Sequence, residues 1–219
     1  MLDLVDFKNK HKGQDIYVIG SGPSCNFIDP SFFDNKVTIG TNQTFRKYDT
    51  TYIVRKEHSL LQETIDNYKG IVFVSMGDCG TVSKKLNTDK YTGLDRVCMY
   101  AHFQNNLTID LKAFDHLGHL CVSHSTITTS IHLAYHLGAK NILLVGVDHG
   151  TLDGKHTFDN YYKDIKESPW ANWDQYKSWL RGIDNDTLKI KAKLSSLGVN
   201  IYSINPFINF SLEGHKYER

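Results

Sequence analysis

The chain has 219 residues, of which 40% are hydrophobic and 22% are charged. That apolar content excludes an intrinsically disordered chain, because enough surface is available for burial to offset the entropy of the backbone. Lys and Arg total 25 against 24 Asp and Glu, so the net charge is +1 and the strong basic excess of a general nucleic-acid binder is missing. We expect one domain over residues 1–219 and no nucleic-acid partner.

The cysteines and the apolar runs bear on the cellular compartment. Cys25, Cys79, Cys98 and Cys121 are widely spaced without a Cys-x-x-Cys pair, which argues against a zinc ribbon or a dithiol redox site and favours reduced thiols. No apolar run approaches the roughly 20 residues of a membrane span. The first 15 residues lack the apolar stretch of a secretory signal. We therefore expect a cytoplasmic protein without a membrane span.

The first half of the chain shows a regular series of short β-branched runs. We predict strands at residues 15–19, 36–40, 51–54 and 70–74. Leu60, Leu61 and Ile65 are spaced as on a helix, so a helix over residues 58–68 should connect the third strand to the fourth. Residues 77–120 are polar and loosely patterned, and we expect loops and irregular strands there.

The second half alternates helices with strands. Ser125 precedes a helical pattern that runs to Leu137 and stops at Gly138. A strand over residues 141–148 is apolar on both faces, as in the centre of a parallel sheet, and ends at Asp148. A last helix over 184–197 and a strand over 200–204 follow. The inward positions of that helix are predicted to be Leu188, Ile190, Ala192, Leu194 and Leu197.

The order of these elements predicts the fold class. Alternating strands and helices indicate βαβ units and an α/β, Rossmann-like, doubly wound and mostly parallel sheet with helices on both faces. No repeat and no Pro-rich or Gly/Ser-rich linker divides the chain. In such sheets ligands bind beyond the carboxyl ends of the strands, so candidate site residues are sought at those ends.

A glycine-rich turn follows the first predicted strand. In Gly20-Ser21-Gly22-Pro23-Ser24, the two glycines allow backbone N–H groups to come close to a phosphate, and Ser24 adds a hydroxyl. The turn departs from known fingerprints, because Cys25 occupies the position of the third dinucleotide-loop glycine and no Gly-Lys-Ser/Thr follows. A purely structural tight turn is the alternative interpretation.

Two further sets of polar residues follow predicted strands. Asn42 and Gln43 come after the second strand, and the amide of Asn42 suits a ribose or a base, although it could equally cap a helix or turn. Ser123, Ser125 and Thr126 lie ahead of a helix whose N–H groups and dipole favour an anion. Ordinary N-capping by Ser125 is the alternative.

Acidic residues and histidines gather after the strand at 141–148. Asp148, His149 and His156 lie close to Asp153 and Asp159, and this is the chemistry of proton transfer or metal binding. The two histidines are seven residues apart, which matches no known ligand spacing, so we expect no metal site.

Two other groups of rings have ordinary explanations. His132 and His136 are four residues apart without the glutamate of a metalloprotease, which favours core or surface histidines. Trp170, Trp173, Tyr176 and Trp179 form an aromatic belt ahead of the last helix, which serves either for packing or as a lid over a sugar or base.

Several of these segments together resemble a known family. They are residues 19–24 with Ile28-Asp29, then Thr41-Asn42-Gln43, then residues 137–142 with Gly146-Val147-Asp148. In order and spacing they resemble the bacterial sialyltransferases of glycosyltransferase family 42. They are also similar to a related group that includes flagellin-modifying motility accessory factors and the hydroxymethylpterin pyrophosphokinase. The match covers about half of the chain, in islands.

The resemblance implies a Rossmann-like fold that binds CMP-sialic acid without a metal. It implies that Asn42 and the loop at residues 20–24 contact the nucleotide, that residues 123–126 hold the donor, and that His156 stands where the family has a phosphate-contacting tyrosine. One departure concerns the general base. The family has a histidine shortly before the last helix, whereas here none lies between His156 and His215, so His149, His156 or Asp184 would take the proton, or the reaction differs.

We therefore expect a metal-independent glycosyltransferase that moves a sugar from a CMP-linked donor to a glycan acceptor, with no cofactor besides that donor. The candidate catalytic residues are His156, His149 and Asp148. The candidate substrate-binding residues are Gly20, Ser21, Gly22, Pro23, Ser24, Asn42, Gln43, Ser123, Ser125 and Thr126. The alternatives are a pterin pyrophosphokinase-like transferase that uses ATP with Mg²⁺, and a non-catalytic nucleotide-sugar-binding module. A homo-oligomer would supply further surface for the acceptor.

Overall fold

The computed structural model describes residues 2–58, 60–76, 91, 93–105, 111–115, 118–163, 173–204 and 217–218. Among these residues, eight strands form one parallel sheet in the order β6-β5-β4-β3-β2-β1-β7-β9. The strands are β1 (Asp15–Ile19), β2 (Val37–Thr41), β3 (Tyr52–Arg55), β4 (Ile71–Ser75), β5 (Val97–Asn105), β6 (His119–Val122), β7 (Asn141–Val145) and β9 (Asn200–Ile204). Two short strands, β8 (Thr151–Leu152) and β10 (Tyr217–Glu218), pair antiparallel beside it.

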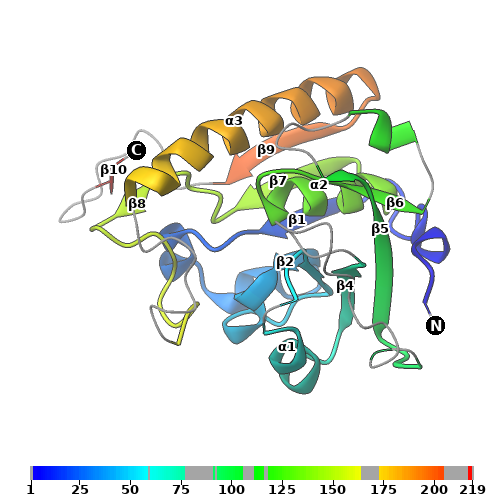
Figure 1. The fold of residues 1–219 in the computed structure, drawn as a ribbon, viewed down its shortest axis with the longest axis horizontal. Helices are drawn as coiled ribbons and strands as arrows, with labels where there is room; N and C mark the ends of the chain where they lie inside the picture. The colour runs from blue at the N-terminus through cyan, green and yellow to red at the C-terminus, as the bar shows by residue number, and fades with distance from the viewer. Residues whose placement is uncertain are drawn as a thin grey trace.

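The sheet reverses its direction of growth at β1 (Figure 1). From β1 to β6 each strand is added to the same edge, and the chain then returns to the other side of β1 with β7 and β9. Ile19, the last residue of β1, therefore lies opposite Gly40 on one side and Val145 on the other. At such a switch point the loops that follow the two neighbouring strands diverge and leave a crevice.

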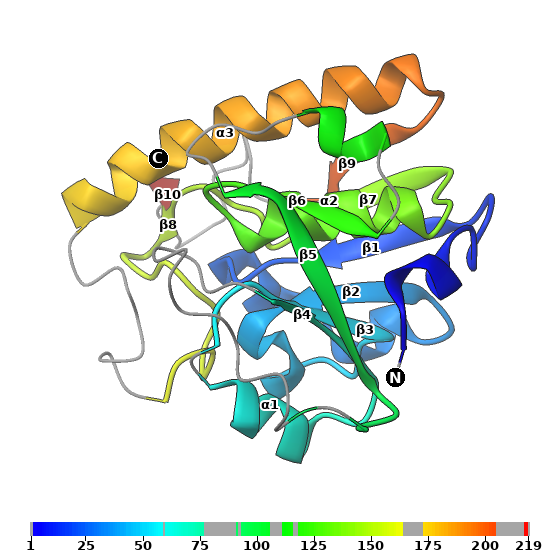
Figure 2. The same cartoon turned by 45° about the vertical axis from the view of Figure 1, so that its right-hand side comes forward.

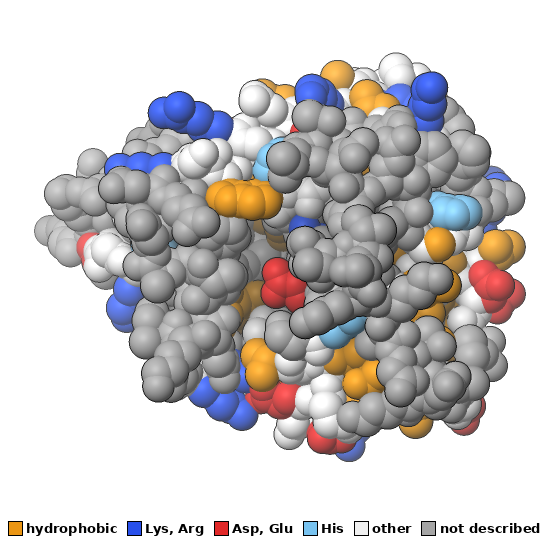
Figure 3. Space-filling view, in the orientation of Figure 1, with side chains coloured by type: hydrophobic (Ala, Val, Ile, Leu, Met, Phe, Trp, Pro, Cys, Tyr) orange, Lys and Arg blue, Asp and Glu red, His pale blue; other side chains and the backbone are white. Residues whose placement is uncertain are grey.

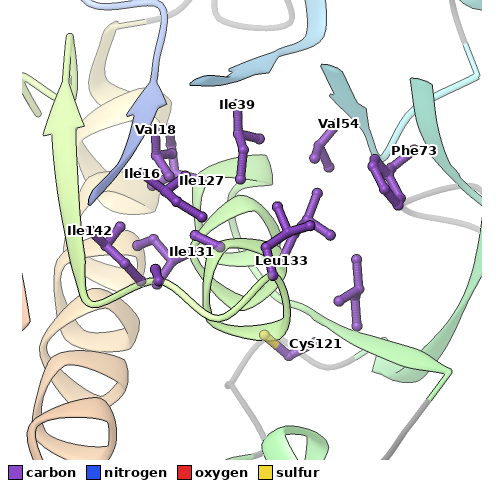
Figure 4. Packing of buried hydrophobic residues seen from close by; sticks show 14 of the residues in the cluster. Ile16, Val18, Ile39, Val54, Phe73, Cys121, Ile127, Ile131, Leu133 and Ile142 are labelled. Atoms are coloured by element: carbon purple, nitrogen blue, oxygen red, sulfur yellow. The ribbon is translucent and has the colours of Figure 1, made fainter. Parts of the chain in front are cut away.

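One face of the sheet is covered by α2 (Thr126–His136) and α3 (Trp173–Ser196). The side chain of Ser125 caps α2 by accepting the Ile127 N–H, and the helix ends before Gly138, which has a left-handed φ of +88°. Ten of the eleven residues of α2 are buried, and Figure 4 shows Ile127, Ile131 and Leu133 directed at the strands. The strand residues they meet include Ile16, Val18, Ile39, Val54 and Phe73.

The opposite face carries α1 (Leu61–Asn67) and short 3-10 helices (Figure 2). Leu61 and Ile65 pack against Val72 and Val74, whereas the intervening Phe73 belongs to the cluster under α2, as the alternation of a strand requires. The 3-10 helices on this face are η2 (Pro23–Phe27), η3 (Pro30–Phe33) and η4 (Asn42–Arg46). Two others, η1 (Leu4–Phe7) and η6 (Leu111–Asp115), pack into the cluster on the α2 side. The predicted α/β class, with a parallel sheet and helices on both faces, is confirmed.

Most predicted strands agree with the structure to within a residue, but two segments differ. The strand predicted at 141–148 stops at Val145, so Asp148 lies three residues beyond its end. The loops expected within 77–120 are in part a regular sheet, because β5 pairs in parallel with β4 and β6, while residues 77–90 lie outside the described residues.

The last helix, predicted over residues 184–197, is longer in the structure, where it is α3 (Trp173–Ser196), and only some of its predicted inward residues are buried. It begins at Trp173, so the aromatic positions 173, 176 and 179 belong to it. Ile190 and Leu194 are fully buried, as predicted, but Leu188 is 63% exposed, Leu197 is 44% exposed and Ala192 is exposed. Because α3 forms an outer layer, it buries one narrow stripe, and a residue two positions from Ile190 points to the opposite side.

The surface is of mixed charge. On the face shown in Figure 3, Lys and Arg side chains lie among Asp and Glu side chains, and the described atoms form no large area of one sign. No helix within the described ranges combines the length and the apolar character that a membrane span requires.

Candidate functional site

Two adjoining cavities open at the carboxyl ends of the strands. The larger, of about 140 Å³, lies between the residues that follow β2, β3 and β6. The smaller, of about 60 Å³, lies between the loops that follow β1 and β7. Both are lined by the same six residues, Ser21, Ser125, Ile127, His156, Tyr176 and Ile183. The two cavities thus form one depression, here called the switch-point cleft, and it brings together Gly22, Asn42 and Ser125.

The glycines of the first loop do not present their N–H groups to the cleft. The N–H of Gly20 donates to the Val145 carbonyl and that of Gly22 to the Gly146 carbonyl, both at 2.7 Å. A Cβ on Gly20 would lie 2.5 Å from the Gly146 oxygen, and one on Gly22 would lie 2.6 Å from it. The N–H groups of these two glycines are thus engaged within the protein, and a phosphate contact of the loop through its other N–H groups stays a prediction. The glycines allow the β1 loop to approach the β7 loop.

Asp148 holds the same loop from the other side. Its Oδ2 accepts the backbone N–H of Ser24 at 2.7 Å and its Oδ1 accepts the Ser24 hydroxyl at 2.6 Å. Burial raises the pKa of the Asp148 carboxyl, and the two bonds from Ser24 oppose that rise. Both oxygens accept a hydrogen bond from Ser24, so the carboxylate holds the loop in place, and the proton transfer predicted for Asp148 stays a prediction.

The loop consequently contributes fewer binding groups than the sequence suggests. Pro23 and Ser24 are buried, and neither they nor Gly20 line the cleft. Ser21 lines both cavities and Gly22 borders the smaller one. Of the five residues predicted to bind, these two border the cleft, whereas Gly20 and Ser24 are bonded to Val145 and Asp148 and Pro23 is buried.

Asn42 begins η4 directly after β2 and has a left-handed backbone with φ of +50°. Asparagine tolerates this conformation better than most residues. Its Nδ2 donates to Thr126 Oγ1 at 3.4 Å, while its buried Oδ1 has no hydrogen-bond partner within the described part of the chain. A buried acceptor without a donor is costly unless a ligand or water supplies one. Gln43, also buried, lines the same cavity.

The residues ahead of α2 divide into two groups. Ser125 lines both cavities while its Oγ accepts the Ile127 N–H at 3.2 Å, so it is both a helix cap and a cleft residue. Thr126 lines the larger cavity. Ser123, in contrast, is buried outside both cavities with its hydroxyl 2.9 Å from Thr128 Oγ1. The predicted binding role of Ser123 is therefore not supported.

His156 and His149 both reach the cleft. His156 lines both cavities with its ring centroid 5.5 Å from that of Tyr176, and burial lowers its pKa. His149 borders the smaller cavity from a left-handed position, and its Nδ1 is bonded to Asp184. The buried Nε2 of His149 has no partner among the residues the structure describes.

Several residues of the larger cavity were not predicted from the sequence, among them Lys56, Glu57, His124 and Tyr161. Lys56 and Glu57 directly follow β3, so the rule on strand ends would have found them. His124 lies between two serines that were selected. Nothing in the sequence signals Tyr161, which reaches the cavity from the loop after β8.

The remaining predicted groups have less to do with the cleft. His132 and His136 are core residues, bonded to the Cys121 N–H and the Leu4 carbonyl. Tyr176 lines the cleft, whereas Trp170 and the side chain of Trp173 lie outside the described residues, so the aromatic lid stays a prediction. Within the described ranges no three His, Cys, Asp or Glu side chains are grouped as metal ligands.

Comparisons with known proteins bear on the fold. No protein-family model and no curated protein sequence matches the chain. Among solved structures, the Campylobacter jejuni sialyltransferase CstII, in complex with the substrate analogue CMP-3FNeuAc, has a TM-score of 0.52 at 16% identity, over 89% of this chain and 82% of that one. This chain shares that fold.

Two further structures agree. CstII with cytidine-5'-monophosphate has a TM-score of 0.52 at 14% identity, over 90% of this chain and 82% of that one. The monofunctional alpha-2,3-sialyltransferase Cst-I of Campylobacter jejuni has a TM-score of 0.51 at 16% identity, over 89% and 77%. The resemblance found in the sequence motifs is thus confirmed at the level of the fold.

Proposed function

We propose that the chain is a glycosyltransferase of the sialyltransferase type, which takes its sugar from a CMP-linked donor and passes it to a glycan acceptor. The observation that carries the proposal is the switch-point cleft, where hydroxyl and amide groups from four strand ends meet the start of α2. The fold is shared with CstII, whose solved complexes contain CMP and CMP-3FNeuAc.

The donor phosphate is proposed to lie at the start of α2. The dipole of the eleven-residue helix favours an anion at its first turn. Ser21, Ser125 and Thr126 add hydroxyls around this point. Lys56, whose ammonium donates to the Ser123 carbonyl at 2.6 Å, adds a positive charge to the same cavity.

The nucleoside is proposed to contact Asn42 and Gln43. The unpartnered Oδ1 of Asn42 is an acceptor for a ribose hydroxyl or a cytosine amino group. Pairing a buried acceptor on ligand binding removes a desolvation cost of about 1–3 kcal/mol. Asn42 is therefore proposed to contribute to affinity through an acceptor that has no hydrogen-bond partner among the described residues.

His156 is proposed to assist departure of CMP. Its lowered pKa keeps the imidazole neutral at pH 7, and a neutral imidazole donates one hydrogen bond. Donation to the phosphate oxygen that gains charge as the glycosidic bond breaks stabilises the transition state. His149 remains a second proposed catalytic group in the smaller cavity.

The cellular setting belongs to the same proposal. Cys25, Cys98 and Cys121 are buried free thiols, which suits the reducing cytoplasm. The glycan acceptor and a second copy of the chain are proposed partners.

A panel of ligands tests the proposal. CMP at about 100 times its Kd should stabilise the protein by about 2.7 kcal/mol, or roughly 5–10 °C in Tm for a chain of this size. CMP-N-acetylneuraminic acid should also be consumed with release of CMP. A shift with ATP and Mg²⁺ but not with CMP would support the pyrophosphokinase alternative and reject this one. Binding of CMP without consumption of CMP-N-acetylneuraminic acid would support the non-catalytic nucleotide-sugar-binding module and reject the glycosyltransferase.

Variants at the cleft sharpen the result. Asn42→Ala should weaken CMP binding about tenfold, and His156→Ala should slow the release of CMP. The matched control is Asn67→Ala, because Asn67 is an exposed asparagine at the end of α1 that bonds only the Glu63 carbonyl in the described structure. Equal CMP affinity in wild type, Asn42→Ala and Asn67→Ala would reject the proposed nucleotide site.

A further inference from the structure

His124 is held at the edge of the larger cavity by a carboxylate from α3. Its side chain is 15% exposed, and its Nδ1 lies 2.9 Å from Oδ2 of Asp186. Asp186 itself is almost completely buried, with 2% of its side chain exposed. A histidine that shares a hydrogen bond with a buried carboxylate is fixed in both orientation and tautomer.

The helix is shaped to receive this imidazole. Trp179, Gly182 and Asp186 are spaced three and four residues apart, so they share one side of α3. A Cβ on Gly182 would lie 2.6, 2.7 and 2.8 Å from Nε2, Cδ2 and Cε1 of His124. Three nearly equal distances mean that the face of the ring lies over Gly182, while Trp179 meets its edge at a centroid distance of 5.1 Å.

Gly182 lowers the stability of α3, and its contact with the His124 ring explains why glycine occupies this position. Glycine inside a helix is less favourable than alanine by about 1 kcal/mol, and Gly182 lies inside the 24-residue α3. A methyl group there would overlap the imidazole. Glycine at position 182 therefore lowers the stability of the helix but leaves space for the His124 imidazole.

The contacts leave one nitrogen available. Since Asp186 accepts the Nδ1 proton, the neutral ring carries its lone pair on Nε2. In the described part of the chain Nε2 has no hydrogen-bond partner, and the residue lines the larger cavity beside Ser125 and Thr126. A substrate hydroxyl in that cavity would meet an acceptor nitrogen on a ring that Asp186 holds in place.

The other cleft histidines are less suited to accept a proton. His149 has a similar pairing with Asp184, but its Nε2 is fully buried and it borders only the smaller cavity. His156 has a pKa that burial lowers, which weakens it as a base. His124 pairs with a carboxylate, lines the larger cavity and keeps 15% of its side chain exposed.

We propose that His124, oriented by Asp186, is the catalytic base that takes the proton of the acceptor hydroxyl; this rests on the proposed glycosyltransferase function. The O–H bond of the acceptor breaks and its proton moves to Nε2. The hydroxyl oxygen bonds to the anomeric carbon of the sugar as the bond from that carbon to the CMP phosphate oxygen breaks, and its electron pair leaves on CMP. The imidazolium then returns the proton to solvent.

Charged groups around His124 affect the same step. Asp186 is its direct partner on α3, and Lys189 Nζ lies 4.0 Å from Oδ1 of Asp186. Lys56 and Glu57 line the cavity from the end of β3. The first variant therefore changes the imidazole alone and leaves these charges in place.

His124→Asn tests the base directly. The release of CMP from CMP-N-acetylneuraminic acid, with water and a set of free disaccharides as probe acceptors, should fall by about 100-fold or more. The Kd for CMP should stay within about threefold, and the acid limb of the wild-type kcat profile should disappear. The matched control is His11→Asn, since His11 bonds Tyr52 at the amino end of the sheet.

Two further variants test positioning. Asp186→Asn and Gly182→Ala should lower kcat by about tenfold or more with little change in the KM for the donor. Gly182→Ala favours the helix, so a fall in kcat without a fall in Tm shows that the displaced imidazole is responsible. Imidazole added to His124→Gly should restore part of the activity.

The outcomes separate the two proposals. A wild-type protein that neither binds CMP nor consumes the donor would reject the proposed function, and the base with it. A wild type that transfers sugar while His124→Asn keeps its rate would reject the base alone. If His149→Asn and not His124→Asn abolishes transfer, the base is His149 with Asp184, and this inference is overturned.

Discussion

Ser24 donates both of its polar hydrogens to the carboxylate of Asp148, which lies 124 residues further along the chain. Both residues are buried, with 1% and 4% of their surface exposed. The pair joins the loop after β1 to the loop after β7, the two strands that flank the switch point. The shape of the smaller cavity therefore depends on this pair.

Removing either partner should destabilise the protein. Asp148→Ala leaves a buried N–H without an acceptor and should lower the free energy of unfolding by about 1–3 kcal/mol, and Ser24→Ala should cost about 1 kcal/mol. Urea unfolding of the two variants and the double variant should give a coupling energy of about 0.5–3 kcal/mol. Additive losses would show that the two residues do not act together.

The same pair distinguishes positioning from catalysis. Asp148→Asn should lose stability and CMP affinity together, because the loop that carries Ser21 shifts. A variant with wild-type stability and CMP affinity but no turnover would instead make Asp148 a proton-transfer group.

Gly22 is the position where a methyl group should be least tolerated. Its Cβ would lie 2.4 Å from Oδ2 of Asp148 and 2.6 Å from the Gly146 carbonyl oxygen. Backbone cannot move aside as a long side chain can, so Gly22→Ala should cost about 2–3 kcal/mol in urea unfolding. Gly154→Ala is the control, since its Cβ would meet nothing within 4 Å and only its left-handed φ of +75° is penalised. An equal loss in both variants would contradict the packing argument.

The sheet was largely predictable because its strands are buried on both faces. Runs such as Ile142-Leu143-Leu144-Val145 carry the apolar, β-branched signal that such burial requires. The bounds of β5 were not predicted because only its first half, Val97 to Ala101, is apolar, while its second half and the segments on both sides are mostly polar. The extra turns of α3 were missed because its outer position leaves most of its surface polar.

The place of the cleft was predictable, but the roles of its residues were only partly so. Strand ends locate the cleft because parallel strands bring their carboxyl ends to one edge. The internal bonds of the glycine loop could not be predicted because their acceptors, Val145, Gly146 and Asp148, are far away in sequence. His124 was missed because its partner Asp186 comes from a helix 62 residues later.

Ser125 allows helix capping and ligand binding to be separated. Ser125→Ala should cost about 1 kcal/mol of stability through loss of the cap and should also weaken CMP binding. Ser125→Asp should keep the cap, because aspartate accepts the same N–H, yet its charge should repel a phosphate in the cleft. Thermal unfolding and CMP titration of the two variants should therefore rank them in opposite orders. The same rank in both measurements would place the phosphate elsewhere.

His132 should make the fold sensitive to mild acid. Burial, with a smaller contribution from His136, lowers the pKa of His132 to about 3. Its Nδ1 accepts the Cys121 N–H at 2.9 Å, and its ring stacks on Phe114 with the ring centroids 4.1 Å apart. The unfolded chain takes up the proton near pH 6.5 while the folded chain does not. The stability that neutral His132 provides is therefore complete above pH 6.5 and is lost as the pH falls towards 3.

The expected slope is about 1.4 kcal/mol per pH unit from this one group. Urea unfolding at pH 7, 6 and 5 measures it. His132→Gln should be less stable than the wild type at pH 7, because a packed ring is lost, but its stability should fall less steeply on acidification, by about 1 kcal/mol per pH unit. The two stability curves should therefore converge as the pH falls. Parallel curves would mean that His132 takes up a proton in the folded protein as easily as in the unfolded chain, and the acid sensitivity would then have to come from other groups.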